Sequence, residues 1–170
     1  MSDFDKHNEL RRDQTDTSVE DDPGLLRIFG ERYLAVKHNR NAQMKLLWSS
    51  NPFDRLLSLS LLRKERTLPI EVKEMIHRIA TYKVATYSSD EREIAWLIMS
   101  NLYDSSHDVE ICKLAAEAVL DASNNDEVRL SAYAALLYMT DRAFDTRVPV
   151  SFLEFPSDID WDLVRNYAKN

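Results

Sequence analysis

Residues 125–136 read NDEVRLSAYAAL, and this stretch decides the fold. Its polar start suits the beginning of a helix, because Asn and Asp side chains accept hydrogen bonds from the free backbone N–H groups there. An apolar face then runs over 126–140 at helical spacing, formed by Val128, Ala132, Ala135, Leu136 and Met139. Small residues in the middle of this face let a neighbouring helix approach closely. The stretch therefore predicts a helix packed against another helix.

The preceding segment, 108–121, repeats the pattern at an offset of 19 residues. Ala115-Ala116 aligns with Ala134-Ala135, and Leu120 aligns with Met139. The turn between the two segments, at 123–125, is short, and a short turn makes consecutive helices antiparallel. Units that bury their apolar faces only against the next unit build a solenoid.

Apolar spacing predicts further helices along the chain, over 53–64, 70–86, 90–103 and 158–168, with one or two more within 24–48. Residues 146–156 look extended, and no sheet is expected. Helix starts are indicated by capping residues or by proline, at Asp22-Pro23, Asn51-Pro52, Pro69, Ser88 with Glu91, Asn124 with Glu127, and Ser157 with Asp160.

With an acid in the turn, then Val-Arg, Ala and Ala-Leu, residues 125–136 resemble the second helix of HEAT-type repeats. The resemblance is good over roughly 104–142 and poorer elsewhere, since Glu110 stands where the preceding unit would carry Arg. It implies an all-α fold, a short right-handed α-solenoid of antiparallel helix pairs with about seven helices. The repeat residues are then Asp126, Val128, Arg129, Ala132 and Leu136, with Asp126 and Arg129 supporting neighbouring repeats. An armadillo-like arrangement or an irregular helical bundle is the alternative.

Length and composition are those of one globular domain, with 170 residues of which 44% are hydrophobic and 30% charged. Residues 1–21 are polar and acidic, and we expect a flexible tail followed by a single HEAT-like domain over 22–170. No run of 18 apolar residues predicts a membrane span, and no secretory signal begins the sequence. Together with the single Cys112, these features predict a cytoplasmic protein.

Charge is distributed unevenly along the chain. Residues 1–24 carry a net charge of −5, residues 25–87 carry +7, and residues 88–170 carry −9, which together give the total of −7. Such a field steers association and selects partners. A basic partner would suit the acidic C-terminal half, and nucleic acid is the alternative partner for the basic 25–87 region.

No catalytic, cofactor or metal site is predicted. The two glycines, Gly24 and Gly30, cannot form a phosphate-binding loop or a nucleophile elbow. None of the four histidines, at positions 7, 38, 77 and 107, has a second His or Cys three or four residues away. Cys112 lies on an apolar stripe and is expected to be a buried hydrophobic residue.

These observations predict a non-enzymatic protein-binding module. Some immunity proteins of bacterial toxin systems are HEAT-like, so the sharper hypothesis is an inhibitor that covers the active site of a basic toxin, such as a nuclease. A scaffold or chaperone-like adaptor in an enzyme complex is one alternative, and an enzyme of the lyase or DNA-repair type carried on such repeats is another. The expected partner-binding residues are acidic or aromatic: Glu110, Glu117, Asp121, Asp126, Glu127, Asp158, Asp160, Trp161 and Asp162.

Overall fold

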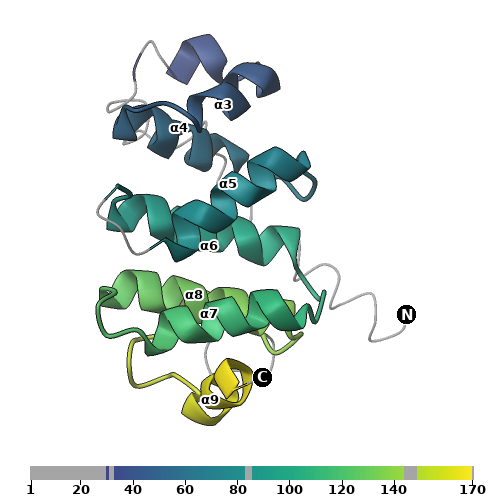
Figure 1. Ribbon diagram of the computed structural model, residues 1–170, viewed down its shortest axis with the longest axis vertical. Helices are drawn as coiled ribbons and strands as arrows, with labels where there is room; N and C mark the ends of the chain where they lie inside the picture. Colours follow the sequence, from purple (N-terminus) through teal and green to yellow (C-terminus); the bar gives the residue numbers. More distant parts are fainter. Residues whose placement is uncertain (1–29, 31–32, 83–85, 144–148, 170) are drawn as a thin grey trace.

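The computed structural model describes residues 30, 33–82, 86–143 and 149–169 (Figure 1). Every regular element in those ranges is helical and none is a strand, which confirms the all-α prediction. The elements are α3 (Arg40–Leu46), α4 (Pro52–Leu62), α5 (Ile70–Thr81), α6 (Ser89–Leu102), α7 (Val109–Leu120), α8 (Asp126–Met139), the 3₁₀ turn η2 (Val150–Phe152) and α9 (Trp161–Lys169). The predicted tail at 1–21 and the start at Asp22-Pro23 lie outside the described ranges.

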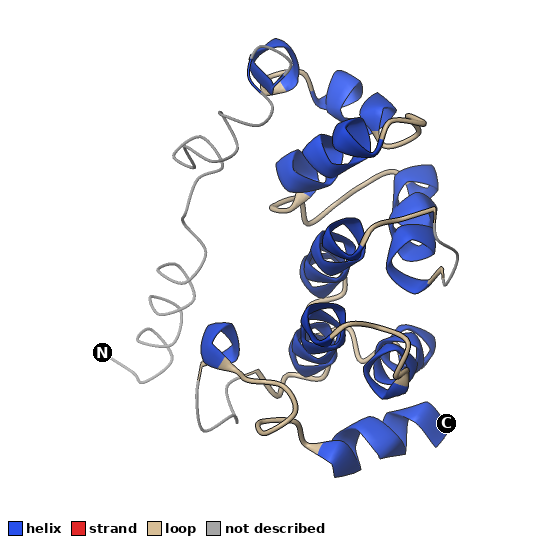
Figure 2. Ribbon diagram, turned by 90° about the vertical axis from the view of Figure 1, so that its left-hand side faces the viewer, coloured by secondary structure: helices blue, strands red, loops and turns tan. Residues whose placement is uncertain are grey.

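The helices follow one another along the long axis of the molecule, from α3 at one end to α9 at the other (Figure 1). Helices α4, α6 and α8 form one row, since α6 packs against both of the others. Beside this row, α3 packs on α4, α5 on α6 and α7 on α8, while α9 packs on α7. Figure 2 shows this arrangement from the side.

Most of the helix starts follow from the capping residues in the sequence. The Asn51 side chain accepts a hydrogen bond from the Phe53 N–H, and Ser88 with Glu91 forms the predicted capping box. The other two predicted boxes are wrong. Asn125, not Asn124, caps α8, because the Asn124 amide is buried and donates to the Ala118 carbonyl at 2.9 Å.

At α9 the cap is Asp160, whose carboxylate accepts from the backbone N–H groups of Asp162 and Leu163. Ser157 instead donates to the Glu154 carbonyl. The prediction of extended backbone over 146–156 is wrong at Val150–Phe152, which form a 3₁₀ turn, whereas Leu153 is extended. Helix α5 ends at Thr81, earlier than predicted, because Tyr82 adopts an extended conformation.

The core lies between the two rows and under α9. Its largest members are Trp96 on α6 and Tyr133 on α8, which are 0% and 1% exposed. Each buried side chain of this size removes a large apolar area from water. Leu163 and Val164 extend the core onto α9. Most of the helix stability therefore comes from packing of apolar faces, as the spacing of those residues predicts.

A register of 37 residues relates the three helices of the α4–α6–α8 row. Their N-caps are Asn51, Ser88 and Asn125, each 37 residues after the one before. Four residues after each cap stands an arginine, and seven after each cap stands a small buried residue, Ser58, Ala95 or Ala132. The offset of 19 between α7 and α8 does not align their starts, because the caps Asp108 and Asn125 are 17 residues apart.

Candidate functional site

Three arginines at equivalent positions tie the row of helices to the segments before it. Arg129 donates through Nε to the Val119 carbonyl at 2.9 Å, at the end of α7. Arg92 donates to the Ala80 carbonyl of α5 at 3.4 and 3.5 Å. Arg55 reaches the loop that precedes α4. An arginine at this position thus donates hydrogen bonds to carbonyl groups of the preceding helix or loop, which would otherwise lack donors.

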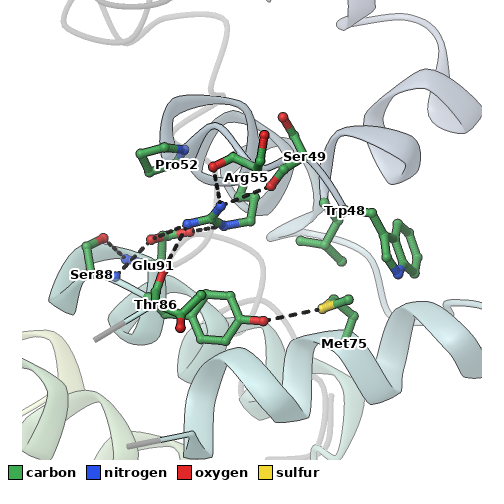
Figure 3. A pocket seen from close by; sticks show the side chains of 11 residues that line it. Trp48, Ser49, Pro52, Arg55, Met75, Thr86, Ser88 and Glu91 are labelled. Atoms are coloured by element: carbon green, nitrogen blue, oxygen red, sulfur yellow. Dashed lines mark hydrogen bonds and ion pairs between the residues drawn. The ribbon is translucent and has the colours of Figure 1, made fainter. Parts of the chain in front are cut away.

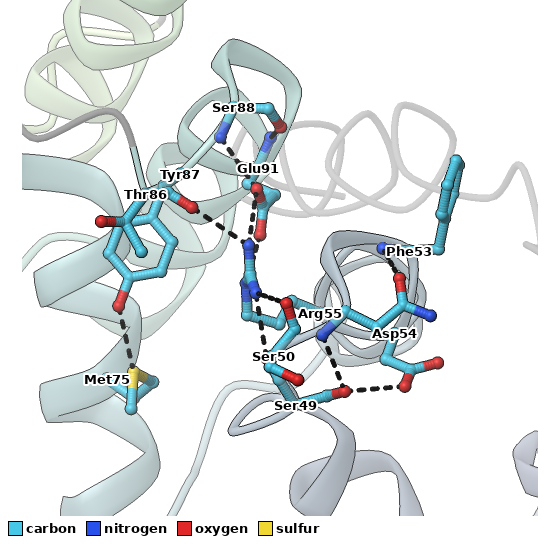
Figure 4. Close-up of polar contacts among 11 residues, drawn as sticks. Ser49, Ser50, Phe53, Asp54, Arg55, Met75, Thr86, Tyr87, Ser88 and Glu91 are labelled. Atoms are coloured by element: carbon cyan, nitrogen blue, oxygen red, sulfur yellow. Dashed lines mark hydrogen bonds and ion pairs between the residues drawn. The ribbon is translucent and has the colours of Figure 1, made fainter.

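Arg55 makes the largest of these networks (Figure 4). Its Nε donates to Glu91 Oε1 at 2.6 Å, and its Nη2 donates to Glu91 Oε2 at 3.3 Å. The remaining donors bind the backbone carbonyls of Ser49, Ser50 and Thr86. These five bonds match the five N–H donors of a guanidinium group. Arg55 therefore joins α4, α6 and both loops that precede them, and has no donor left for a ligand.

A groove opens between the N-terminal ends of α4 and α6 (Figure 3). Its volume is about 560 Å³, which is within the usual range for ligand pockets. Trp48 and Met75 stand at one side, and Arg55 with Glu91 stand at the other. Trp48 is 49% exposed, whereas Tyr87 is half-buried. We call this hollow the groove; its other lining residues are Leu47, Ser49, Ser50, Pro52, Thr86, Tyr87 and Ser88.

The side chains of Ser49, Arg55, Ser88 and Glu91 in the groove are hydrogen-bonded to one another or to neighbouring residues. The Ser49 hydroxyl donates to Asp54 at 2.8 Å, and the Ser88 hydroxyl accepts from the Glu91 N–H. Glu91 also accepts from the Ser88 N–H at 2.8 Å, in addition to the bonds from Arg55. The Tyr87 hydroxyl lies 3.9 Å from the Met75 sulfur. What the groove offers a ligand is therefore mainly apolar surface.

Beside the groove, the surface of the row is acidic. Asp90 on α6 and Glu127 on α8 are exposed and stand at equivalent positions, two residues after the N-cap. Burial raises the pKa of Glu93, and the charges of Asp90 and Glu127 raise it further. Asp90 and Glu127 therefore each lie close enough to repel Glu93, and we call these three carboxylates the acidic cluster. The matching position on α4 is Phe53, which is 62% exposed.

The structure divides the predicted partner-binding residues among three places. Glu110 and Glu117 are exposed on α7, and Asp121 lies at the end of that helix. Asp126 and Glu127 begin α8, and only Glu127 belongs to the acidic cluster. The others surround the start of α9: Asp158, Asp160, Trp161 and Asp162.

Several of these side chains have local structural contacts. Asp126 lies 3.7 Å from Arg129, and Asp162 lies 2.7 Å from Arg165. Asp160 caps α9, and its backbone N–H donates to the Tyr133 hydroxyl. Trp161 is half-buried and packs edge-on against Phe155 at 5.8 Å. The Arg129 guanidinium in turn lies 4.1 Å above the Phe155 ring. Trp161 therefore helps attach α9 to the rest of the domain.

Part of the basic 25–87 region is also committed to internal contacts. Arg40 pairs with Glu65 at 2.9 Å and donates to the Thr67 carbonyl, while Arg55 pairs with Glu91. Arg40 and Arg55 are therefore engaged in contacts within the fold, and these two basic side chains are not free to bind a phosphate backbone.

Other reactive side chains lie away from the groove. Cys112 is buried, and burial raises the pKa of its thiol to about 11. His77 on α5 packs against the Tyr103 ring at 5.3 Å, and burial lowers its pKa. Asp141, which follows α8, contacts two residues of the α6–α7 turn: it accepts a hydrogen bond from the Ser105 hydroxyl and lies 2.9 Å from the His107 ring nitrogen. Within the described ranges, no three His, Cys, Asp or Glu side chains are grouped to hold a metal ion.

None of the described helices has the length and apolar character needed to cross a membrane. Comparison with family models, curated proteins and solved structures finds no match.

Sequence reasoning missed both the groove and the Arg55–Glu91 pair. The apolar walls of the groove come from three segments, since Trp48 precedes α4, Met75 is on α5 and Tyr87 precedes α6. The recurrence of arginine at 55, 92 and 129 is the one sequence signal that could have located these helix ends.

Proposed function

We propose that this chain is a HEAT-type helical-repeat protein that acts by binding another protein, without catalysing a reaction. The sharper form of the proposal is an immunity or inhibitor protein that covers the active site of a basic toxin, such as a nuclease. The observation that carries the proposal is the 37-residue register, because it aligns Asp90 and Glu127 on neighbouring helices and leaves both exposed.

The register supports the repeat fold on three counts. Equivalent helices begin with the same type of cap, carry arginine at the same position, and bury a small residue one turn later. Helix α6 packs against both α4 and α8, so each unit buries its face against the next. A right-handed stack of antiparallel helix pairs, α3–α4, α5–α6 and α7–α8, would follow from these relationships.

The acidic cluster supports a basic partner. The charges of Asp90 and Glu127 raise the pKa of Glu93, so bringing the three carboxylates together is unfavourable in the free protein. A cation from a partner would relieve this repulsion and would favour encounter over long distances. Asp90 and Glu127 also stand at equivalent positions on adjacent helices. This spacing suits a surface that binds basic side chains along an extended or helical segment of the partner.

The test is affinity capture from cells that contain the native partner, with the purified chain as bait. We expect the wild-type chain to recover a basic polypeptide at moderate salt and the Asp90→Lys/Glu127→Lys variant to lose it. Glu71→Lys is the matched control, because Glu71 is also the second residue of its helix but lies on α5, in the other row. Each change removes the same favourable interaction of an acid with a helix N-terminus.

Recovery of a basic polypeptide by the wild-type chain and the Glu71→Lys variant alone would support the proposal. Equal recovery by all three chains would mean that the acidic cluster does not bind the partner. The proposal would fail outright if the wild-type chain captured no basic polypeptide at any salt concentration. Inhibition of a nuclease activity carried by the captured polypeptide would then test the immunity function itself.

A further inference from the structure

The groove and the acidic cluster share helix α6. Glu91 lines the groove and pairs with Arg55 on α4, and exposed Asp90 is its neighbour in the chain. Glu93 lies about 200° further round the helix and interacts with Glu127 on α8. A segment that leaves the groove and crosses α6, a width of about 10 Å, would therefore meet Asp90 first and then reach Glu93 and Glu127. The groove supplies an apolar contact and the cluster a negatively charged one, on the two sides of the same helix.

We infer that the partner binds this region through a basic segment with one bulky apolar side chain, which enters the groove while neighbouring Lys or Arg residues bind the acidic cluster. This inference rests on the proposed function, because it names how the proposed basic partner is recognised. The negative charge beside the groove determines the sign of the charge on the segment. The walls of the groove determine the apolar side chain.

The groove favours an apolar side chain because its two charged groups, Arg55 and Glu91, are already bonded to each other. Arg55 uses its donors on Glu91 and three carbonyls, and Glu91 balances its charge. An anionic side chain would find no free cation among the lining residues and would lose its hydration. Trp48, Met75 and Tyr87 instead offer aromatic faces and a flexible thioether, which adapt to an aromatic or aliphatic side chain.

The size of the groove agrees with this assignment. A volume of about 560 Å³ exceeds what a single side chain fills and admits the adjoining backbone as well. Trp48 is 49% exposed, so it can close over an inserted side chain and gain burial. Aromatic residues that become buried at the centre of an interface commonly carry much of its binding energy.

The experiment measures binding of three labelled peptides to the full chain by fluorescence anisotropy at low salt. One peptide is lysine-rich with a central tryptophan, the second has alanine in place of that tryptophan, and the third keeps the tryptophan with glutamine in place of every lysine. We expect the first peptide to bind about tenfold more tightly than the second. The third peptide should bind more weakly than the first, because it cannot pair with the acidic cluster.

Variants of the protein separate the contribution of the groove to peptide binding from that of the acidic cluster. Trp48→Ala and Met75→Gln should each weaken the first peptide by about fivefold or more and leave the second unchanged. Asp90→Lys/Glu127→Lys should weaken both basic peptides. Phe152→Ala is the control, because it removes an exposed aromatic ring, 72% exposed against 49% for Trp48, from η2 outside the groove. Circular dichroism melts confirm that each variant is folded.

The possible results separate this inference from the proposed function. If both basic peptides bind equally, or if Trp48→Ala and Met75→Gln leave binding of the first peptide unchanged, the groove does not hold an apolar side chain. Only binding by the acidic cluster, as in the proposed function, would then remain. If the glutamine peptide binds as tightly as the lysine peptide, the partner segment is not basic and the inference is wrong. If neither basic peptide binds, the inference is wrong, whereas the proposed function is decided by the capture experiment.

Discussion

Arg55 Nε and Glu91 Oε1 lie 2.6 Å apart, although 36 residues separate them in the chain and their side chains are only 8% and 1% exposed. Glu91 also completes the capping box of α6, so one carboxylate starts a helix and neutralises a buried cation. The pair joins the first two helices of the α4–α6–α8 row at their N-terminal ends. These contacts form one wall of the groove as well (Figure 4).

Removing Arg55 should be strongly destabilising. Arg55→Met leaves Glu91 buried without its cation, and loss of one partner of a buried pair costs about 3–5 kcal/mol of unfolding free energy. Urea denaturation measures the change. Arg142→Met is the control, because Arg142 is half exposed and lies 3.9 Å from Asp160, a surface pair worth less than about 1 kcal/mol. Equal losses in the two variants would show that Arg55 does not hold the row together.

The three equivalent arginines should differ in importance in a defined order. Arg129→Lys loses the 2.9 Å bond to the Val119 carbonyl and the stacking on Phe155, at a cost of about 1–2 kcal/mol. Arg92→Lys should cost less, because its bonds to the Ala80 carbonyl are long, at 3.4 and 3.5 Å. Arg165→Lys on the surface of α9 serves as the control. A larger loss for Arg92→Lys than for Arg129→Lys would contradict this order.

The Cys112 thiol should be unreactive in the folded protein. Burial, with a smaller contribution from Asp108, raises its pKa to about 11, so the thiolate is scarce at pH 8. We expect Ellman's reagent to label it at least about a hundredfold more slowly in buffer than in denaturant. Labelling at the same rate in both conditions would mean that α7 does not bury this face.

His77 should make the fold sensitive to acid. Burial lowers its pKa in the folded state below the ordinary value of 6.5, while Asp108 partly opposes the shift. The unfolded chain therefore binds more protons, and this contribution to stability is present above the ordinary pKa and lost as the pH falls through the folded value. The buried Nε2 has no hydrogen-bond partner among the described residues, so protonation gains nothing in return.

The measurement is the unfolding free energy of wild type and His77→Phe between pH 7.5 and pH 5. We expect the wild type to lose more stability over this interval than His77→Phe, in which the aromatic contact with Tyr103 is preserved and the titration is removed. His38→Gln, at an exposed position, is the control and should follow the wild type. Parallel pH profiles for all three chains would rule out His77 as the acid-sensitive group.

Much of the fold could be predicted from local signals. Apolar spacing locates α4 to α9, because each of these helices must turn one face to the core, as Ile76 and Ile79 do on α5. The Ser88–Glu91 capping box could also be predicted, since both of its hydrogen bonds lie within one turn. Asn124 was the wrong choice of cap because two adjacent asparagines precede α8, and tertiary contacts bury the first of them.

Features that depend on contacts between distant segments could not be predicted in the same way. The 37-residue register is faint in the sequence, because buried residues at equivalent positions differ in size and chemistry, as with Leu59, Trp96 and Tyr133. In the sequence Glu91 is only a capping residue for α6, and its second role appears when the fold places Arg55 beside it.

The most direct test of the account is the association rate constant of the chain with its captured basic partner, measured by stopped flow as ionic strength is raised. We predict that the rate constant falls steeply with salt for the wild type and for Glu71→Lys, and that Asp90→Lys/Glu127→Lys is slower at low salt and much less dependent on salt. A wild-type rate constant independent of ionic strength, or unchanged by reversal of both charges, would contradict the claim that the acidic cluster recruits the partner.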